Sequence, residues 1–291
     1  TTIDSLDFDS EQALNGFYHI PPDPCGAAGP NHLVAVVNTS IWWATKAGAS
    51  INAQSLASFF APVSAVAGEV FDPKVIYDQY AGRFVVVALE QQDTSAGGPA
   101  NTSRILLAVS DDSDPNGTWR FHAINSNINI GGTNHWADYP GLAVDDEAVY
   151  ITNNMFTFGP TNTYGGARLW IMNKTPYYTG GAASVTIHDP SGATGQTATT
   201  MMPAHTFGTV SGATGTWLVR YSAFTDDTNE FLSIIRVDNP ITSPTFAHTF
   251  VNVGNIDNTA ASMPGATQPG TATTIDSGDR RMLHAVWRNN A

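Results

Sequence analysis

The sequence contains one pattern four times. Each copy begins at a proline and continues as an apolar strand, a tight polar turn and a second strand richer in large apolar residues. The four prolines, which are 67, 63 and 66 residues apart, are Pro73, Pro140, Pro203 and Pro269. A period this long, with about four short strands per copy, favours a β-propeller blade over any helical repeat.

The predicted fold is therefore all-β, a β-propeller of four-stranded antiparallel blades that forms a single domain over residues 1–291. Helical patterns are nearly missing, and the best helix candidate, Ala53–Phe60, is short. The expected blades cover approximately residues 20–70, 71–135, 136–200 and 201–267, and a partial fifth blade covers 268–291.

The partial fifth blade shows only two strands, Ala272–Ile275 and Arg280–Arg288. Two strands leave an unpaired sheet edge, which soluble proteins usually cover. In one interpretation Thr2–Phe8, with its alternating apolar residues, adds as an outer strand and closes the ring. In the other, which the unfinished blade favours slightly, the chain is part of a larger propeller that a second polypeptide completes.

The composition narrows the class of partner. Only 13% of the residues are charged, the net charge is −13, and lysine occurs three times. Such a surface repels phosphate backbones and anionic lipids, so neither nucleic acid nor membrane insertion is expected. The polar surface is mostly Thr, Ser, Asn and Gly, a composition common in exported proteins, so we expect a secreted, extracellular protein. The single Cys25 allows no internal disulfide.

The repeat also locates a candidate site. The first strand of each blade lines the propeller axis, and the residues just before it project onto one end of the central funnel, where ligands usually bind. The residues at these positions are Asp23, Asp72, His135, Trp136, Asp138, Tyr139, His205 and Gln268.

Asp72 and Asp138 are the candidate catalytic acid and base, since two carboxyl groups that face each other across a funnel suit glycoside hydrolysis. His135 and His205 are candidate bases or metal ligands, and in a lyase Tyr139 would act as the acid. Trp136 and Tyr139 are candidate platforms for a sugar ring, and blade packing is the alternative role for them. An aspartate before a proline is also a common turn starter, so Asp72 has a purely structural alternative.

Asp23 and Gln268 complete the candidate substrate-binding surface by position. No cofactor motif is present. The acidic turns at residues 111–114, 145–147 and 226–227 resemble no EF-hand loop, and solvated turn acids are the simpler interpretation, with a structural Ca²⁺ as the alternative.

Residues 110–120, SDDSDPNGTWR, resemble the Asp-box of sialidase-type propellers, which occupies the same turn between third and fourth strands. Here Gly117, Thr118 and Trp119 are contiguous, and no arginine precedes a first strand as the sialidase resemblance would require. More broadly, residues 21–38, 71–89 and 138–156 resemble a family of secreted bacterial β-propeller proteins, mostly of unassigned function. That resemblance implies export and the fold, and it carries no catalytic residues.

Two functions follow as expectations. The first is a secreted propeller that binds or cleaves an extracellular polysaccharide at its central funnel, either as a glycoside hydrolase or as a polysaccharide lyase. The second is a non-catalytic interaction module on a cell surface or in a matrix, whose partner is a glycan or an extracellular protein. A pair of carboxyl groups held apart in an open funnel favours the first, and carboxyl groups occupied by backbone amides in a plugged funnel favour the second.

Overall fold

A computed structural model of the chain describes residues 2–49, 51–64, 69–94, 98, 100–181, 184–209, 215–226, 228–256, 265–275 and 281–289. The chain is mostly β, with 53% strand and 9% helix. Short helices connect or precede the strands: α1 (Phe8–Asn15), α2 (Leu56–Phe59), α3 (Lys174–Thr179) and α4 (Ser191–Thr194). No helix among the described residues is long and apolar enough to cross a membrane.

The first two sheets have four strands each, and every strand pairs antiparallel with the next one along the chain. The first sheet consists of β1 (Cys25–Ala28), β2 (His32–Val37), β3 (Ser40–Thr45) and β4 (Asn52–Ser55). The second consists of β5 (Glu69–Asp78), β6 (Arg83–Gln92), β7 (Thr102–Ser110) and β8 (Trp119–Asn125). These strands match the expected four-stranded antiparallel pattern, because short apolar stretches bounded by polar turns mark them in the sequence.

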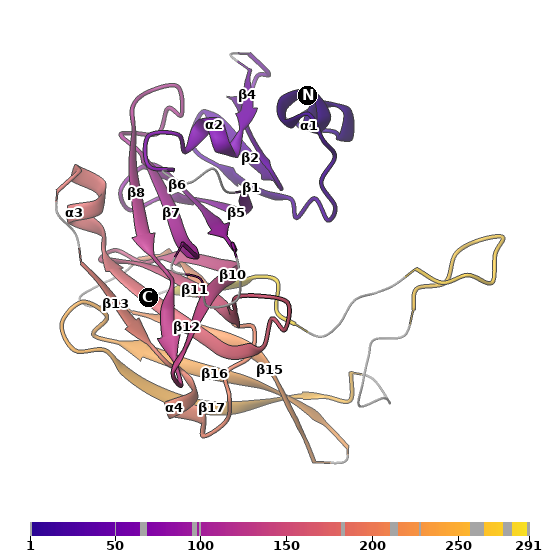
Figure 1. The fold of residues 1–291 in the computed structure, drawn as a ribbon, viewed down its shortest axis with the longest axis vertical. Coiled ribbons are helices and arrows are strands. Elements are labelled where there is room, and N and C mark those ends of the chain that lie inside the picture. Colours follow the sequence, from indigo (N-terminus) through magenta and orange to yellow (C-terminus); the bar gives the residue numbers. More distant parts are fainter. Residues whose placement is uncertain are drawn as a thin grey trace.

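The third and fourth sheets have five strands each. The third consists of β9 (Ile128–Ile130), β10 (Thr133–Val144), β11 (Ala148–Thr157), β12 (Tyr164–Asn173) and β13 (Val185–His188). The fourth consists of β14 (Met202–Gly208), β15 (Thr216–Thr225), β16 (Glu230–Asp238), β17 (Thr245–Gly254) and β18 (Ala285–Asn289). Figure 1 shows the four sheets succeeding one another along a curled stack, from the N-terminal sheet to the C-terminal one.

Three apolar cores lie between neighbouring sheets. Within β6, alternate residues point to opposite sides: Val86 packs in the core shared with the first sheet, and Val85 and Val87 pack in the core shared with the third. All three are fully buried. The strands of the second sheet are therefore apolar on both faces, which only a sheet covered on both sides can tolerate.

The expectation that Thr2–Phe8 adds as an outer strand is wrong, because no strand forms there and α1 begins at Phe8. Asp7 caps this helix, accepting from the Ser10 amide at 2.7 Å, so the local capping signal prevails over the apolar alternation. Glu11 then anchors α1 to the first sheet, since its buried Oε1 accepts from the Thr39 amide at 2.7 Å.

The last strand also differs from expectation. β18 pairs in parallel with β14, from Ala204–Ala285 to Gly208–Asn289, and does not begin an antiparallel sheet of its own. The expected strand Ala272–Ile275 contributes only an isolated bridge between Ala266 and Ile275. Residues 276–280 lie outside the described residues. This long-range parallel pairing leaves no local sequence signal, because no turn links the two strands.

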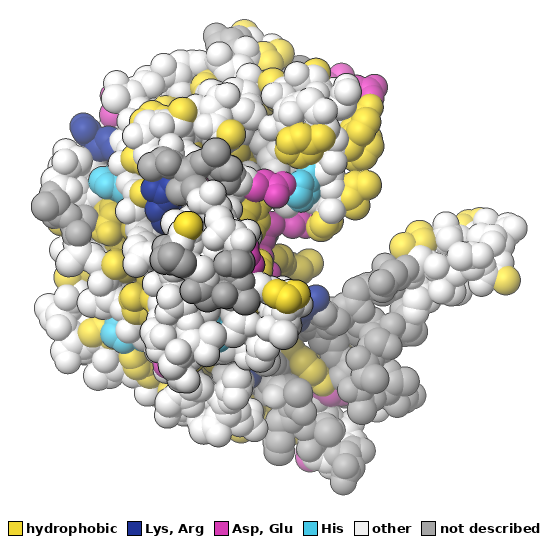
Figure 2. Space-filling view, in the orientation of Figure 1, with side chains coloured by type: hydrophobic (Ala, Val, Ile, Leu, Met, Phe, Trp, Pro, Cys, Tyr) yellow, Lys and Arg dark blue, Asp and Glu magenta, His cyan; other side chains and the backbone are white. Residues whose placement is uncertain are grey.

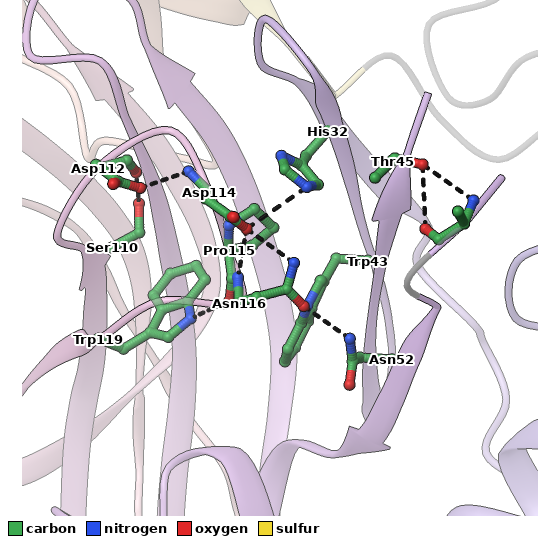
Figure 3. Close-up of polar contacts among 11 residues, drawn as sticks. His32, Trp43, Thr45, Asn52, Ser110, Asp112, Asp114, Pro115, Asn116 and Trp119 are labelled. Atoms are coloured by element: carbon green, nitrogen blue, oxygen red, sulfur yellow. Dashed lines mark hydrogen bonds and ion pairs between the residues drawn. The ribbon is translucent and has the colours of Figure 1, made fainter. Parts of the chain in front are cut away.

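The turn that resembles an Asp-box joins the first sheet to the second (Figure 3). Asn116 Oδ1 accepts from Trp43 Nε1 at 3.0 Å and from Asn52 Nδ2 at 2.8 Å, and both donors belong to the first sheet. Asp114 holds the turn, because its Oδ1 accepts from the Asn116 amide at 2.9 Å. The turn thus has a structural role between neighbouring sheets.

A buried ion pair joins the second sheet to the third. Lys174 Nζ, at the start of α3, lies 2.6 Å from Asp78 Oδ2 and donates to the Asp145 carbonyl at 2.6 Å. Tyr178 donates its hydroxyl hydrogen to Asp78 Oδ2 at 2.8 Å, and the Tyr80 amide donates to Asp78 Oδ1. Each oxygen of this buried carboxylate is therefore paired.

We predict that Lys174→Met destabilises the fold by about 3–5 kcal/mol, because it leaves the buried Asp78 charge without its counterion. Urea denaturation measures the loss. Lys46→Met, which changes an exposed lysine on the first sheet, is the control and should change the free energy of unfolding by less than about 0.5 kcal/mol. Equal stabilities of the two variants would show that the ion pair does not hold the sheets together.

Candidate functional site

Three residues, one before β1, one within β5 and one within β10, share an unusual backbone. Asp23, Asp72 and Tyr139, each directly before a proline, have φ of 43°, 49° and 51°. Strand pairing skips there, between Phe71 and Lys74 in β5 and between Asp138 and Gly141 in β10. A left-handed residue that is not glycine marks local strain, and a bulge redirects the side chains beside it. The repeated bulge brings aspartates from three sheets to one place.

Asp72 lies at the centre of this group. Its Oδ1 accepts from Asn38 Nδ2 at 3.1 Å, and its own amide donates to Asn38 Oδ1 at 2.9 Å. Its Oδ2 accepts from the Tyr139 amide at 3.2 Å. Asp72 therefore connects the first, second and third sheets through one side chain.

The Asp138 carboxyl group lies near that of Asp72, whose negative charge acts on it. Burial, followed by the negative charge of Asp72, raises the pKa of Asp138 to about 7. Burial and the charge of Asp23 also raise the pKa of Asp72. Two carboxyl groups in this arrangement hold one proton between them near neutral pH, because two buried like charges repel.

A row of aromatic rings runs across β5, β10, β11 and β12. Ring centroids are 6.4 Å apart for Phe71 and Trp136, 5.8 Å for Trp136 and Phe156, and 5.3 Å for Phe156 and Tyr164. Phe71 directly precedes Asp72 in β5, and Trp136 lies two residues before Asp138 in β10. Trp136 also donates from Nε1 to Asn162 Oδ1 at 3.1 Å, which fixes the indole. The rings remain partly exposed to solvent.

Acidic side chains gather on one face of the molecule, in a hollow between the N-terminal part and the later sheets (Figure 2). The hollow has a cation beside the aspartates, since Lys74 lies with its Nζ 5.4 Å from the centroid of the Tyr139 ring. Lys74 also lowers the pKa of Asp72, in opposition to burial. Tyr139 thus contacts both the lysine and, through its amide, the carboxyl pair.

Of the residues expected in the site, the structure brings together Asp23, Asp72, Asp138, Trp136 and Tyr139. His135 lies beside them in sequence but is buried, and its Nδ1 lies 2.8 Å from the Thr133 carbonyl. Its ring packs so closely on Gly165 that a Cβ at that glycine would lie 2.4 Å from the imidazole. This histidine has a packing role in the structure.

The structure separates His205 and Gln268 from the carboxyl pair. His205 Nδ1 accepts from the amide of Val144, six residues beyond Asp138 and roughly 20 Å along an extended strand. Burial lowers the pKa of His205 to about 4. Gln268 donates to the Thr273 carbonyl at 3.1 Å, within a segment that projects from the sheets (Figure 1).

Asn38, Phe156 and Tyr164 belong to the site but were not expected there. Phe156 pairs with Trp136 across the hairpin, but the bulge shifts the register by one residue. Counting outward from the turn after Val144 therefore selects Thr157, so the sequence alone does not identify Phe156. Asn38 has no local signal, since only the packing of the first sheet against the second brings it to Asp72.

The acidic turns considered for Ca²⁺ use their carboxylates on the backbone. Asp111 accepts from the Thr118 amide at 3.0 Å, Asp145 from the Ala148 amide at 2.6 Å and Asp226 from the Asn229 amide at 2.7 Å. Among the described residues no group of three or more His, Cys, Asp or Glu side chains is arranged to hold a metal ion. These turns therefore have a structural explanation in their own backbone.

Comparison with known proteins adds no family: no protein-family model matches this chain, and no curated protein matches it.

We predict that the carboxyl pair makes the protein less stable as pH rises from about 4 to about 7. Since the folded state holds the proton more tightly than the unfolded state, this contribution is full below the unfolded pKa and is lost through the folded pKa of about 7. The slope is about 1.4 kcal/mol per pH unit for one such group. Thermal melts between pH 4 and 8 measure it.

Asp138→Asn should flatten this pH dependence and raise the Tm at pH 8, because a neutral amide replaces a carboxyl group that is costly to ionise. Asp4→Asn, at an exposed aspartate, is the control and should leave the pH profile unchanged. An Asp138→Asn protein with the wild-type slope would show that this group does not titrate abnormally.

Proposed function

We propose that this chain is a secreted, propeller-like module that binds an extracellular polysaccharide at the acidic and aromatic site. The propeller arrangement is supported by one small space whose walls include residues of β1, β5, β10 and β14, which is one strand from each of the four sheets. Strands from every sheet around one space are what a propeller axis requires. The surface, poor in charge and rich in neutral polar residues, supports export and a neutral ligand.

The aromatic row supports a sugar as that ligand. Apolar faces of sugar rings stack on aromatic side chains, and carboxylates accept hydrogen bonds from sugar hydroxyl groups. The row Phe71, Trp136, Phe156 and Tyr164 crosses several strands, so it offers an extended surface to a chain of sugar units. The net charge of −13 makes a neutral polysaccharide a better ligand than a polyanion.

One observation favours binding over hydrolysis: both oxygens of Asp72 already accept hydrogen bonds, from Asn38 and from the Tyr139 amide. A carboxyl group that takes part in glycoside hydrolysis must instead face the sugar bond or a water molecule. The geometry therefore fits a rigid binding surface.

Cleavage is the second candidate, and the pKa of about 7 for Asp138 favours it, because an acid of that pKa can donate a proton near neutral pH. A non-catalytic module that binds an extracellular protein is a further alternative and would use the same aromatic surface. The experiment that follows distinguishes all three.

We predict that a glycan array detects a neutral polysaccharide ligand, and that Trp136→Ala weakens its binding at least tenfold. Loss of the ring removes the stacking surface, which is worth on the order of 1–3 kcal/mol. Isothermal titration with the glycan found on the array measures the change. Tyr18→Ala, at a half-exposed aromatic residue of the N-terminal segment, is the control and should retain full affinity.

Product analysis of the bound glycan separates binding from cleavage. Intact glycan after prolonged incubation supports the binding module, and shortened products that disappear in Asp138→Asn establish hydrolysis instead. If no glycan binds and Trp136→Ala loses only a protein partner, the interaction module is the function.

A further inference from the structure

A polar pocket lies at the end of the aromatic row, and its volume is about 340 Å³. Tyr164, the last ring of the row, directly precedes Gly165 in the pocket wall. Its hydroxyl group donates to the Ala198 carbonyl, in the opposite part of the wall, at 2.7 Å. The pocket therefore adjoins the row. Its walls come from β9 (Ile130), β12 (Gly165, Gly166 and Arg168) and the segment 189–198 between β13 and β14.

The side chains around this pocket are mostly polar, and their charges cancel. Among the described lining residues only Arg168 and Asp189 are charged, and Arg168 Nη2 lies 3.3 Å from Asp189 Oδ2. The Asp189 side chain is 46% exposed, and Gln196 and Thr197 are exposed, so a ligand can reach them. A neutral ligand with many hydroxyl groups suits such walls, because each hydroxyl group finds a donor or an acceptor.

Arg168 is fixed in place while part of its guanidinium remains for a ligand. Nη1 donates to the Ala167 carbonyl at 2.8 Å, and Nη2 pairs with Asp189. Each of these nitrogens carries two hydrogens, so each has a second hydrogen beyond these contacts. Gly166 makes the position possible, since its φ of 90° suits glycine and a Cβ there would lie 3.3 Å from Arg168 Nη1.

Gln196 is fixed through its acceptor atom. Its Oε1 accepts from Arg220 Nη2 at 3.2 Å, which leaves its amide hydrogens to donate. Arg220 is buried in β15, and its Nη1 also donates to the Thr197 carbonyl and to the Thr199 hydroxyl oxygen, both at 3.3 Å. An arginine of the fourth sheet thus holds the wall in place. Ordered polar groups lose little conformational entropy when a ligand binds.

Two glycines of the wall face open space. Nothing lies within 4 Å of where a Cβ of Gly192 or of Gly195 would be. Gly195 has a φ of 65°, so a side chain there would be strained. Gly192 lies in α4 and has no such strain. A larger residue at Gly192 can therefore fill the pocket without distorting the backbone.

We propose that this pocket binds one neutral sugar unit by hydrogen bonds and selects the arrangement of hydroxyl groups on that unit. The inference rests on the sugar-binding function proposed for the aromatic row, which supplies affinity by stacking. Arg168 and Gln196 donate to sugar oxygens, and Asp189 accepts from a hydroxyl group. A sugar with a misplaced hydroxyl group leaves one of them unpaired, and a site built for hydrogen bonds rejects such a ligand.

The test uses the whole chain and the methyl glycosides of glucose, galactose, mannose and xylose, titrated while amide NMR shifts are followed. We expect saturable shifts at Gly192, Gly195 and Gln196, with one sugar preferred by about fivefold or more. Glucuronic acid should bind more weakly than the preferred sugar, because its carboxylate meets Asp189. These probes are single units, so they report on the pocket without the aromatic row.

Gln196→Glu should weaken the preferred sugar by about tenfold and leave the Tm unchanged, because the carboxylate still accepts from Arg220 but no longer donates. Gln12→Glu is the matched control, since it adds the same charge at an exposed residue of α1 and should keep full affinity. Gly192→Leu should abolish sugar binding at the pocket by filling it, and should leave stacking at Trp136 intact.

The outcomes separate this inference from the proposed function. Absence of saturable shifts at residues 191–198, equal binding of all four sugars, or full affinity in Gly192→Leu overturns the inference, while glycan binding that depends on Trp136 still stands. Absence of any glycan on the array, or a bound glycan that ignores Trp136→Ala, overturns the proposed function and does not change the result with single sugars.

Discussion

Sheet packing on both faces is the constraint on which this structure depends. In β6 the residues alternate between two cores, with Val86 toward the first sheet and Val85 toward the third. Such a strand loses a large part of its buried apolar area if either neighbouring sheet is absent. The middle sheets are therefore held by their neighbours, and the order of the stack follows the order of the repeat.

The outer sheets need other covers, and the structure provides them from the ends of the chain. On the first sheet, α1 is anchored by the buried Glu11, which accepts from Thr39. On the fourth, the Arg236 guanidinium contacts the rings of both Trp217 and Trp287, 5.1 Å and 4.9 Å from their centroids. Trp287 belongs to β18, so this contact helps to explain why the last strand joins the fourth sheet.

Much of the fold could be predicted from the sequence, because period-two alternation and polar turns are local signals. The errors lie where a distant contact or a competing local signal decides. At Thr2–Phe8 the apolar alternation indicated a strand, whereas Asp7 and Ser10 form a helix cap. The repeat predicted the part of the site that lies beside its prolines. Asp72 and Asp138 follow from their positions shortly before Pro73 and Pro140. Asn38 and Tyr164 were not, since sheet packing and strand register bring them to the site.

Each core joins only neighbouring sheets, so each sheet is stabilised mainly by the sheets next to it. In such an arrangement local unfolding begins at the terminal sheets, which have one neighbour each. The carboxyl pair and Trp136 belong to the second and third sheets, which have neighbours on both sides. Openings of the backbone are rarest there. A ligand at this surface meets groups that are already ordered, and little conformational entropy is lost when it binds. The repeat thus places the carboxyl pair and Trp136 in the middle sheets, away from the ends of the stack.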